Sequence, residues 1–457
     1  MVRYCALAAA LVIVAVAQAQ AAPQTDRCVV LVSIDGLAGF YLDDPRAEMP
    51  TLRRLAREGA RASGMLCSFP TVTWPNHTTL VTGVTPAKHG VIGNNFFDRK
   101  AGRPVALILD PEYGKEQIVR APTIYDVAHR AGLKTAGIIW PMTRGASTID
   151  FNAPDMVTFE EWQQYGTRSW IDELAADGIP VDRASKWFKE PGGGVMRDWM
   201  YTRMFRQVLD KHQPNLLMIH IVEVDHVEHK YGPRTAEAYW SVSHADDRLR
   251  DLVEAVEASP WRGKTTFFVC SDHGFFTIRR EIRPNVLLKQ MKLVELDGSK
   301  ITSRKAWCVA QGGGCAVYVL DEAHKPELVA KLKEALAQVE GVEKVLLSEQ
   351  FDTIGQPTLA VDPHAADLWV TASENYSFGD TSTGDDVVTA RESIGGTHGY
   401  LPEHDDLLGT CVLWGPTITP GTRLGKIANL DIAPTMAKVL GVELPNVEGK
   451  VLEVFVP

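Results

Sequence analysis

The sequence predicts an α/β protein with a mostly parallel central sheet, helices on both faces of that sheet and a small α+β insert. Short apolar runs alternate along the chain with segments of helical periodicity, which is typical of parallel strands buried on both faces. Polar residues follow several of these runs directly. The chain has 457 residues, of which 45% are hydrophobic and 23% charged, so it can bury a substantial core.

The expected strands are the apolar runs between turn residues. The first, at 28–34, ends at Asp35-Gly36, and the others are 135–140, 216–222, 265–270, 366–371 and 410–414. Helical patterns cover 52–59 and 236–258, and Pro260 lies just beyond the second of these. Two elaborations on this core are expected, at about 155–195 and about 281–390, and the second contains a helix near 327–339. Neither reads clearly as a separate domain.

Residues 1–22 have the pattern of a signal peptide. Arg3 supplies a positive charge, residues 6–17 form an apolar stretch of 12 residues, and small residues suited to cleavage follow. A bilayer takes about 20 helical residues to cross, so this stretch is too short to span one. We expect an exported protein, periplasmic or secreted, in which residues 23–457 form one domain without a membrane span. An uncleaved membrane anchor is the alternative.

The charge of the chain limits its partners. The net charge is −10, and the basic residues do not cluster. Because proteins that bind nucleic acid along its backbone need a basic surface, the sequence argues against extended nucleic-acid binding. A small anionic molecule is compatible with this charge where local cations offset it. The sequence does not define the oligomeric state.

Candidate metal ligands follow three of the expected strands and occur at two further positions. In open α/β sheets, sites form beyond the carboxyl ends of the strands, so such residues converge. Each residue alone has an ordinary interpretation as a helix cap or a solvated loop residue. Together they supply the carboxylate oxygens and imidazole nitrogens that suit zinc. The candidates are Asp35, Asp225, His229, Asp272, His273 and His398.

Thr73 is the candidate nucleophile. It lies two residues before Pro75, and proline suits the first turn of a helix, so Thr73 is expected at a helix N-terminus. A threonine there is either an N-cap or a hydroxyl activated by a metal and the helix dipole. Position alone favours the N-cap.

The motifs around these residues resemble those of the nucleotide pyrophosphatase/phosphodiesterase family, which belongs to the alkaline phosphatase superfamily. The resemblance covers most of the chain from Val29 onward and implies an alkaline phosphatase-like catalytic domain in residues 23–457. In chain order, the matching motifs are TVTWPNH from Thr71, LVTG from Leu80, HGVIGN from His89, DHVEHKYGP from Asp225, SDHG from Ser271, THGY from Thr397 and NLDIAPT from Asn429.

The resemblance implies a site with two zinc ions and a covalent intermediate on Thr73. Asn94 matches the family residue that donates a hydrogen bond to a phosphoryl oxygen. One zinc ion would be held by Asp35, Thr73, Asp272 and His273, and the other by Asp225, His229 and His398.

The implied substrates are nucleotide 5′-phosphodiester and pyrophosphate bonds. Trp74 matches an aromatic residue that stacks on a base, although a packed core tryptophan is an equal alternative. Five residues before Asp225, nucleotide-cleaving relatives have tyrosine where this chain has His220, whose imidazole can also stack. This departure leaves the nucleotide preference open. The alternatives are a phosphonoacetate hydrolase, a non-nucleotide phosphodiesterase and a non-catalytic binding protein on the same fold.

Overall fold

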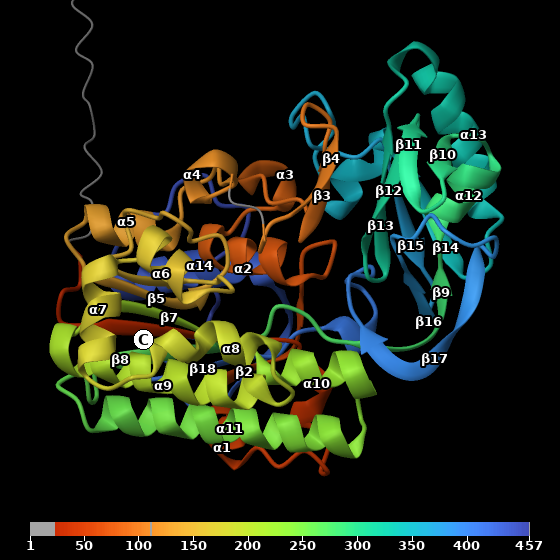
Figure 1. Cartoon of the computed structure of the whole chain (residues 1–457). Coiled ribbons are helices and arrows are strands. Elements are labelled where there is room, and N and C mark those ends of the chain that lie inside the picture. Colours follow the sequence, from red (N-terminus) through yellow and green to blue (C-terminus); the bar gives the residue numbers. More distant parts are fainter. Residues whose placement is uncertain (1–22, 110–111, 457) are drawn as a thin grey trace, which may run out of the picture.

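The computed structural model describes residues 23–109 and 112–456 (Figure 1). The expected signal peptide, residues 1–22, lies outside the described residues. None of the helices in the described ranges combines the length and the apolar character needed to cross a membrane.

A central sheet with eight described strands organises the molecule (Figure 1). From β8 to β6 each strand is parallel to the next, and β19 is parallel to β2. β18 runs antiparallel to both of its neighbours. In spatial order the strands are β19 (Thr422–Ala428), β2 (Ala60–Leu66), β18 (Cys411–Trp414), β8 (Thr265–Cys270), β1 (Cys28–Ile34), β7 (Leu216–Ile221), β5 (Thr135–Trp140) and β6 (Phe151–Pro154).

Helices cover both faces of this sheet, which explains why β1 is apolar along its whole length. Val30 and Val32 belong to the core shared with α1 (Pro50–Glu58), α9 (Gly193–His212) and α11 (Ala236–Glu257). Val29 and Leu31 point to the opposite face and belong to the core shared with α2 (Thr73–Thr82), α5 (Ile124–Arg130) and α14 (Ile432–Leu440). Figure 1 shows these two helix layers on either side of the sheet. The predicted fold class is confirmed, and α1 and α11 are the helices expected at 52–59 and 236–258.

A second sheet lies beside the central one and forms the α+β insert (Figure 1). Its order is β12-β13-β15-β14, all antiparallel, with α13 (Lys325–Ala337) packed on it. A three-stranded sheet, β16-β9-β17, adjoins it. These strands are β12 (Ala306–Gln311), β13 (Gly314–Val319), β14 (Val342–Leu347), β15 (Leu368–Ala372), β9 (Phe276–Ile282), β16 (Asn375–Phe378) and β17 (Val388–Thr397).

The strand expected at 366–371 belongs to this second sheet, which corrects its expected place in the parallel sheet. It is β15, and it pairs antiparallel with β13 and β14. The misassignment has a physical reason. An apolar run is typical of any strand covered on both faces, whether its neighbours are parallel or antiparallel.

The helices after residue 155 pack onto the central core. Trp162 in α6 (Phe159–Tyr165) and Trp170 in α7 (Arg168–Ala176) are buried in the same cluster as Val30. The remaining helices and strands are α3 (Pro86–His89), α4 (Lys115–Ile118), α8 (Ala184–Lys189), α10 (Glu223–Tyr231), α12 (Pro284–Gln290), β3 (Asn95–Asp98), β4 (Arg103–Ala106), β10 (Val294–Asp297) and β11 (Lys300–Arg304).

Candidate metal centre

The candidate ligands gather where the central strands end. β8, β1 and β7 are parallel neighbours, so their carboxyl ends share one edge of the sheet. Asp35 follows β1 directly, and Asp272 and His273 follow β8. β7 leads into α10, where Asp225 and His229 are four residues apart and therefore share a helix face. His398 arrives from the end of β17.

The first group of ligands, which we call the enclosed cluster, consists of Asp35, Asp272 and His273. These residues are 5%, 0% and 0% exposed. His273 Nε2 lies 3.3 Å from Asp35 Oδ1 and 3.2 Å from Asp272 Oδ2. None of these three atoms has a hydrogen-bond partner within the described ranges. Because buried polar atoms are normally paired, unpaired atoms that converge in this way fit a bound cation.

The turn after β1 holds this cluster together. Gly36 adopts a φ of +75°, and a Cβ there would lie 2.6 Å from the ring of Phe275. Glycine lets the chain turn at this point, and the Gly36 N–H donates a hydrogen bond of 3.1 Å to Asp272 Oδ1. The other oxygen of Asp272 remains directed at His273.

The second group, the open cluster, consists of Asp225, His229 and His398. His229 Nε2 lies 3.3 Å from Asp225 Oδ1 and 3.2 Å from His398 Nε2. The Nδ1 atoms of His229 and His398 face the carbonyl oxygens of Gly396 and Thr71, at 3.2 and 2.9 Å. A carbonyl accepts a hydrogen bond, so each Nδ1 carries the hydrogen. Each Nε2 is then left with the lone pair that a metal requires.

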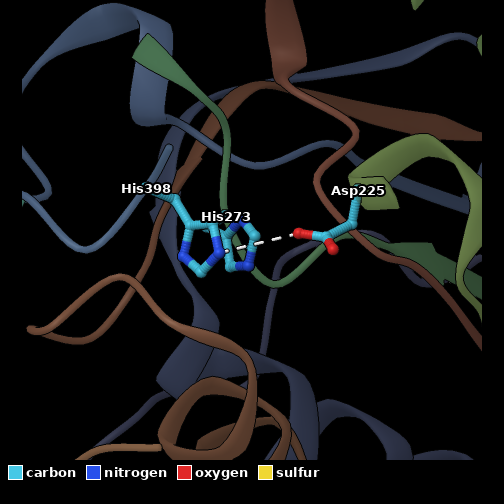
Figure 2. Close-up of side chains that lie close together, drawn as sticks. All are labelled: Asp225, His273 and His398. Atoms are coloured by element: carbon cyan, nitrogen blue, oxygen red, sulfur yellow. Dashed lines mark ion pairs between the residues drawn. The ribbon is translucent and has the colours of Figure 1, made fainter. Parts of the chain in front are cut away.

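The two clusters adjoin each other at His273. Its ring stacks on that of His398, with 3.7 Å between centroids and an interplanar angle of 10°. Figure 2 shows the Asp225 carboxylate directed toward these two imidazoles. Ligand atoms of Asp225, His273 and His398 also lie within 4.8 Å of one another. The structure thus brings all six candidate ligands other than Thr73 into one region.

Two further histidines contact the aspartates of the enclosed cluster. His220 is 2% exposed, and its Nε2 lies 2.9 Å from Asp35 Oδ2 while its Nδ1 lies 3.2 Å from the Ile139 carbonyl. His77 Nδ1 lies 2.8 Å from the Thr73 carbonyl and 3.6 Å from Asp272 Oδ2. His220 is therefore buried behind a candidate ligand, which differs from the base-stacking position expected from the sequence.

Thr73 is the first residue of α2, and the N-cap is Val72. The alternative interpretation of Thr73 as the N-cap therefore does not describe this helix. Asn94 lies beside the same turn, because its Oδ1 accepts a 2.8 Å hydrogen bond from the Trp74 N–H. The two hydrogens on Asn94 Nδ2 are then the donors available to a substrate. Trp74 is 5% exposed and packs with Val91 and other apolar residues, as the core alternative predicts.

Thr71 joins the segment before Thr73 to the loop that carries His398. It is fully buried, and its carbonyl oxygen accepts hydrogen bonds from His398 Nδ1 and the Gly399 N–H, both at 2.9 Å. Its hydroxyl donates to the Tyr400 carbonyl at 3.0 Å and accepts from the Gly399 N–H at 3.0 Å. The segment that leads into Thr73 and the loop that carries His398 are thereby joined by a common set of hydrogen bonds.

Electrostatics distinguish the two clusters. Burial, followed by the charge on Asp225, raises the pKa of Asp35 well above its usual range. Burial, followed by repulsion from Asp35, does the same to the pKa of Asp272. In the open cluster, burial acts to raise the pKa of Asp225, but His229 and His398 outweigh it and lower that pKa. Burial therefore disfavours the charged form of both enclosed carboxylates, and a bound cation would favour it.

A cavity of about 620 Å³ lies on the other face of α10. Its lining includes Glu223, His226, Val227 and Lys230, which the helical period places away from Asp225 and His229. None of the six candidate ligands lines it. The candidate metal centre and this cavity are therefore separate features.

The chain matches a known protein family over most of its length. The model of the family named type I phosphodiesterase / nucleotide pyrophosphatase matches residues 29–401. The chain belongs to this family. Its members are phosphodiesterase and pyrophosphatase hydrolases. The family resemblance inferred from the motifs is confirmed.

Curated relatives match about half of the chain. An uncharacterized pyrophosphatase/phosphodiesterase of Schizosaccharomyces pombe is 27% identical over 248 residues, which are 54% of this chain and 44% of that relative. Venom phosphodiesterase 2 of Crotalus adamanteus is 26% identical over 249 residues, 54% of this chain and 26% of that enzyme. Human ectonucleotide pyrophosphatase/phosphodiesterase family member 1 is 25% identical over 247 residues, 54% of this chain and 23% of that protein. The matched region spans less than half the length of each relative.

Solved structures share the fold over nearly the whole chain. Murine ectonucleotide pyrophosphatase/phosphodiesterase 5 superposes with a TM-score of 0.66 at 19% identity, covering 94% of this chain and 100% of that one. An inactive variant of the same murine protein, in complex with AMP, gives a TM-score of 0.65 at 19% identity, covering 93% and 97%.

Two contributors to the region, His77 and Gln311, were missed in the sequence, and a third, His220, was assigned to substrate binding. His77 follows Thr73 by four residues, and a histidine at this helical spacing from a candidate nucleophile is a usable signal. The position of His220 gave no signal of its bond to Asp35, because the two residues come from different strands. Gln311 approaches Asn94 from the second sheet, and no sequence pattern relates the two.

Proposed function

We propose that this chain is an exported, zinc-dependent hydrolase of phosphodiester and pyrophosphate bonds, of the nucleotide 5′-phosphodiesterase type, with Thr73 as its nucleophile. The observation that carries the proposal is the adjacency of two ligand clusters, one of which is linked to the Thr73 turn through His77. Family membership supports the reaction class. The complex of the murine neighbour with AMP supports a nucleotide substrate.

The donor sets of the two clusters fit zinc. Each offers carboxylate oxygen together with imidazole nitrogen, and the enclosed cluster leaves buried ligand atoms unpaired. We assign Asp35, Asp272, His273 and the Thr73 hydroxyl to one zinc ion. The other is assigned to Asp225, His229 and His398. When bound, the two ions would lower the pKa of the Thr73 hydroxyl and neutralise charge on the leaving oxygen.

Thr73 and Asn94 carry out the proposed transfer of the phosphoryl group. Thr73 Oγ1 gives up its proton to solvent and forms a bond to phosphorus. The bond from phosphorus to the leaving oxygen breaks, and that oxygen keeps the electron pair and takes a proton from solvent on release. Asn94 Nδ2 donates a hydrogen bond to a non-bridging oxygen as its charge grows. Water then attacks phosphorus, the bond to Thr73 breaks, and the hydroxyl is restored. Asn94 is a neutral donor, which favours a diester over the more highly charged monoester.

A substrate panel tests the reaction class. We expect the purified zinc-loaded protein to hydrolyse p-nitrophenyl thymidine 5′-monophosphate faster than p-nitrophenyl phosphate or phosphonoacetate. Preferential turnover of phosphonoacetate would instead indicate a phosphonoacetate hydrolase, and turnover of non-nucleotide diesters alone would remove the nucleotide assignment. A protein that holds two zinc ions but hydrolyses none of these substrates would be a non-catalytic binding protein on this fold.

The Thr73→Ala variant tests the nucleophile. Because alanine lacks the hydroxyl that forms the bond to phosphorus, we expect turnover to fall by at least about 10³-fold. Zinc content, measured by atomic emission, should remain within one equivalent of wild type, because the six other ligands are intact. The Thr73→Ser variant keeps the hydroxyl and serves as the control. Turnover close to wild type in Thr73→Ala would remove Thr73 from its role.

We also propose that residues 1–22 are removed as a signal peptide. Residues 23–457 would then act as one catalytic domain with elaborations at about 155–195 and about 281–390. N-terminal sequencing of the exported protein tests this assignment, and a sequence that starts at Met1 would contradict it.

A further inference from the structure

The hairpin between β12 and β13 reaches from the second sheet into the region of Asn94. Gln311, the last residue of β12, is 3% exposed. Its Oε1 accepts a 3.0 Å hydrogen bond from the Asn94 N–H, and its Nε2 donates to the Asn95 carbonyl. One side-chain amide therefore bonds the N–H of Asn94 and the carbonyl of the next residue, Asn95. These two bonds restrain the orientation of the Asn94-Asn95 segment as well as its position.

The side chain of Asn94 is held separately, by its bond from the Trp74 N–H. Gln311 fixes the backbone of Asn94, and Trp74 fixes its carboxamide. The direction of the Nδ2 hydrogens follows from these two restraints together. The Asn94 carbonyl also accepts a 3.0 Å hydrogen bond from the Leu107 N–H. Loss of Gln311 would leave the Asn94 N–H without its partner, so the peptide before Asn94 would be less restrained and the Nδ2 donors would be less well aligned.

Gly93, the residue before Asn94, leaves room for the Gln311 side chain. A Cβ on Gly93 would lie 2.9 Å from both terminal atoms of the Gln311 side chain. Any residue larger than glycine at that position would push the amide away from Asn94. The Gly93-Asn94 step of the sequence is thus matched to a glutamine that lies more than 200 residues later.

The same hairpin also touches the open cluster. The Gly313 N–H donates a 2.7 Å hydrogen bond to the His398 carbonyl. A Cβ on Gly312, whose φ is +72°, would lie 2.2 Å from that carbonyl oxygen. The hairpin tip is therefore packed against both sides of the site, which limits the movement of Gln311 relative to it.

We propose that Gln311 is a positioning residue that aligns Asn94 with the transferred phosphoryl group, so that the second sheet takes part in catalysis through its hairpin. The inference rests on the proposed function, because the role of Asn94 comes from it. Gln311 itself touches no reacting atom in this scheme. It acts on the reaction through Asn94 alone.

Gln356 provides a matched control in the same insert. It is also a buried glutamine, 3% exposed, and its Nε2 donates to the carbonyls of Phe69 and Ile92 at 2.6 and 3.3 Å. It thus holds Ile92, two residues before Asn94, and Phe69, four residues before Thr73, without a bond to Asn94. A loss of Gln356 loosens the packing there, whereas a loss of Gln311 also releases Asn94.

A double-mutant cycle tests the inference. The variants are Gln311→Ala, Asn94→Ala and Gln356→Ala, together with each glutamine variant combined with Asn94→Ala. We expect Gln311→Ala to lower kcat about 10- to 100-fold, as a misplaced transition-state contact does, with zinc content unchanged. In the Asn94→Ala background the same change should cost less than about twofold, because the contact it aligns is absent. Gln356→Ala should have the same effect in both backgrounds.

The outcomes separate this inference from the proposed function. An equal loss from Gln311→Ala with and without Asn94 would show a structural role only and overturn the inference, while the hydrolase remains. A wild-type rate in Asn94→Ala would remove Asn94 from the reaction and the inference with it. Absence of turnover in the zinc-loaded wild type would overturn both. If Gln311→Ala does not fold, Gln311→Glu keeps the acceptor for the Asn94 N–H, and the same comparison in both backgrounds applies.

Discussion

The enclosed cluster and the open cluster offer similar ligand atoms in different surroundings. The side chains of Asp35, Asp272 and His273 are 7%, 0% and 0% exposed. Those of Asp225, His229 and His398 are 15%, 43% and 8% exposed. The enclosed carboxylates are also contacted by histidines and by the Gly36 N–H, whereas the ligands of the open cluster rely on backbone carbonyls.

This difference in exposure predicts different zinc affinities at the two proposed metal positions. Ligands that follow β1 and β8 are held by the sheet, and a cation among them is shielded from water. Ligands on α10 and on the loop after β17 lie closer to solvent. We therefore expect the enclosed position to bind zinc more tightly and to release it more slowly than the open position.

The Asp272→Asn variant gives the largest expected effect. Asn keeps an oxygen for the Gly36 N–H but removes one of the two carboxylates of the enclosed cluster, so one zinc equivalent should be lost. Activity should fall by at least about 10³-fold, since a metal contributes several kcal/mol to the transition state. Native mass spectrometry counts the metals. The matched change Asp225→Asn should remove the other zinc, and retention of two ions in both variants would contradict the assignment.

The His220→Ala variant should have an intermediate effect confined to the enclosed cluster. Loss of a hydrogen-bond partner of a metal ligand typically lowers metal affinity about 10- to 100-fold. Competition with a chelator of known affinity measures this for each ion. Weakening of both ions by the same factor would mean that His220 supports the fold in general, and not Asp35 in particular.

The pH dependence should be the mildest distinction. In the metal-free protein the pKa of Asp35 and of Asp272 is raised, so the folded chain holds protons that the unfolded chain has released. The free energy of unfolding of the metal-free protein is therefore highest below the usual carboxyl pKa range. It falls as the pH rises through the raised pKa values of Asp35 and Asp272. Bound zinc would stabilise the charged carboxylates and so offset this loss. The increase in Tm on adding zinc should therefore be larger at pH 8 than at pH 6, by differential scanning calorimetry. An increase that is smaller at pH 8 would contradict the burial argument.

Much of the fold was predictable because it depends on local pattern. The apolar runs at 28–34, 216–222 and 265–270 lie in the central sheet, and the rule for strand ends located Asp35, Asp272 and His273 beside each other. The run at 366–371 was assigned to the wrong sheet because burial on both faces does not reveal which strands are its neighbours.

The unpredicted parts of the site depend on contacts between distant segments. His220 was expected to face a base, but a side chain on a central strand points to whichever face its register dictates, and here that is toward Asp35. The register depends on the pairing of β1 with β7, which the sequence of either strand alone does not specify. Gln311 was missed for the same reason, since its partner Asn94 lies more than 200 residues earlier in the sequence.

The bonds at Thr71 have a consequence for how the protein tolerates change. Because the residues leading into α2 and the loop after β17 are fastened together there, we expect a tilt of one sheet against the other to carry both along as one body. The separation between the start of α2 and the His398 imidazole should then change less than other distances when the two sheets shift.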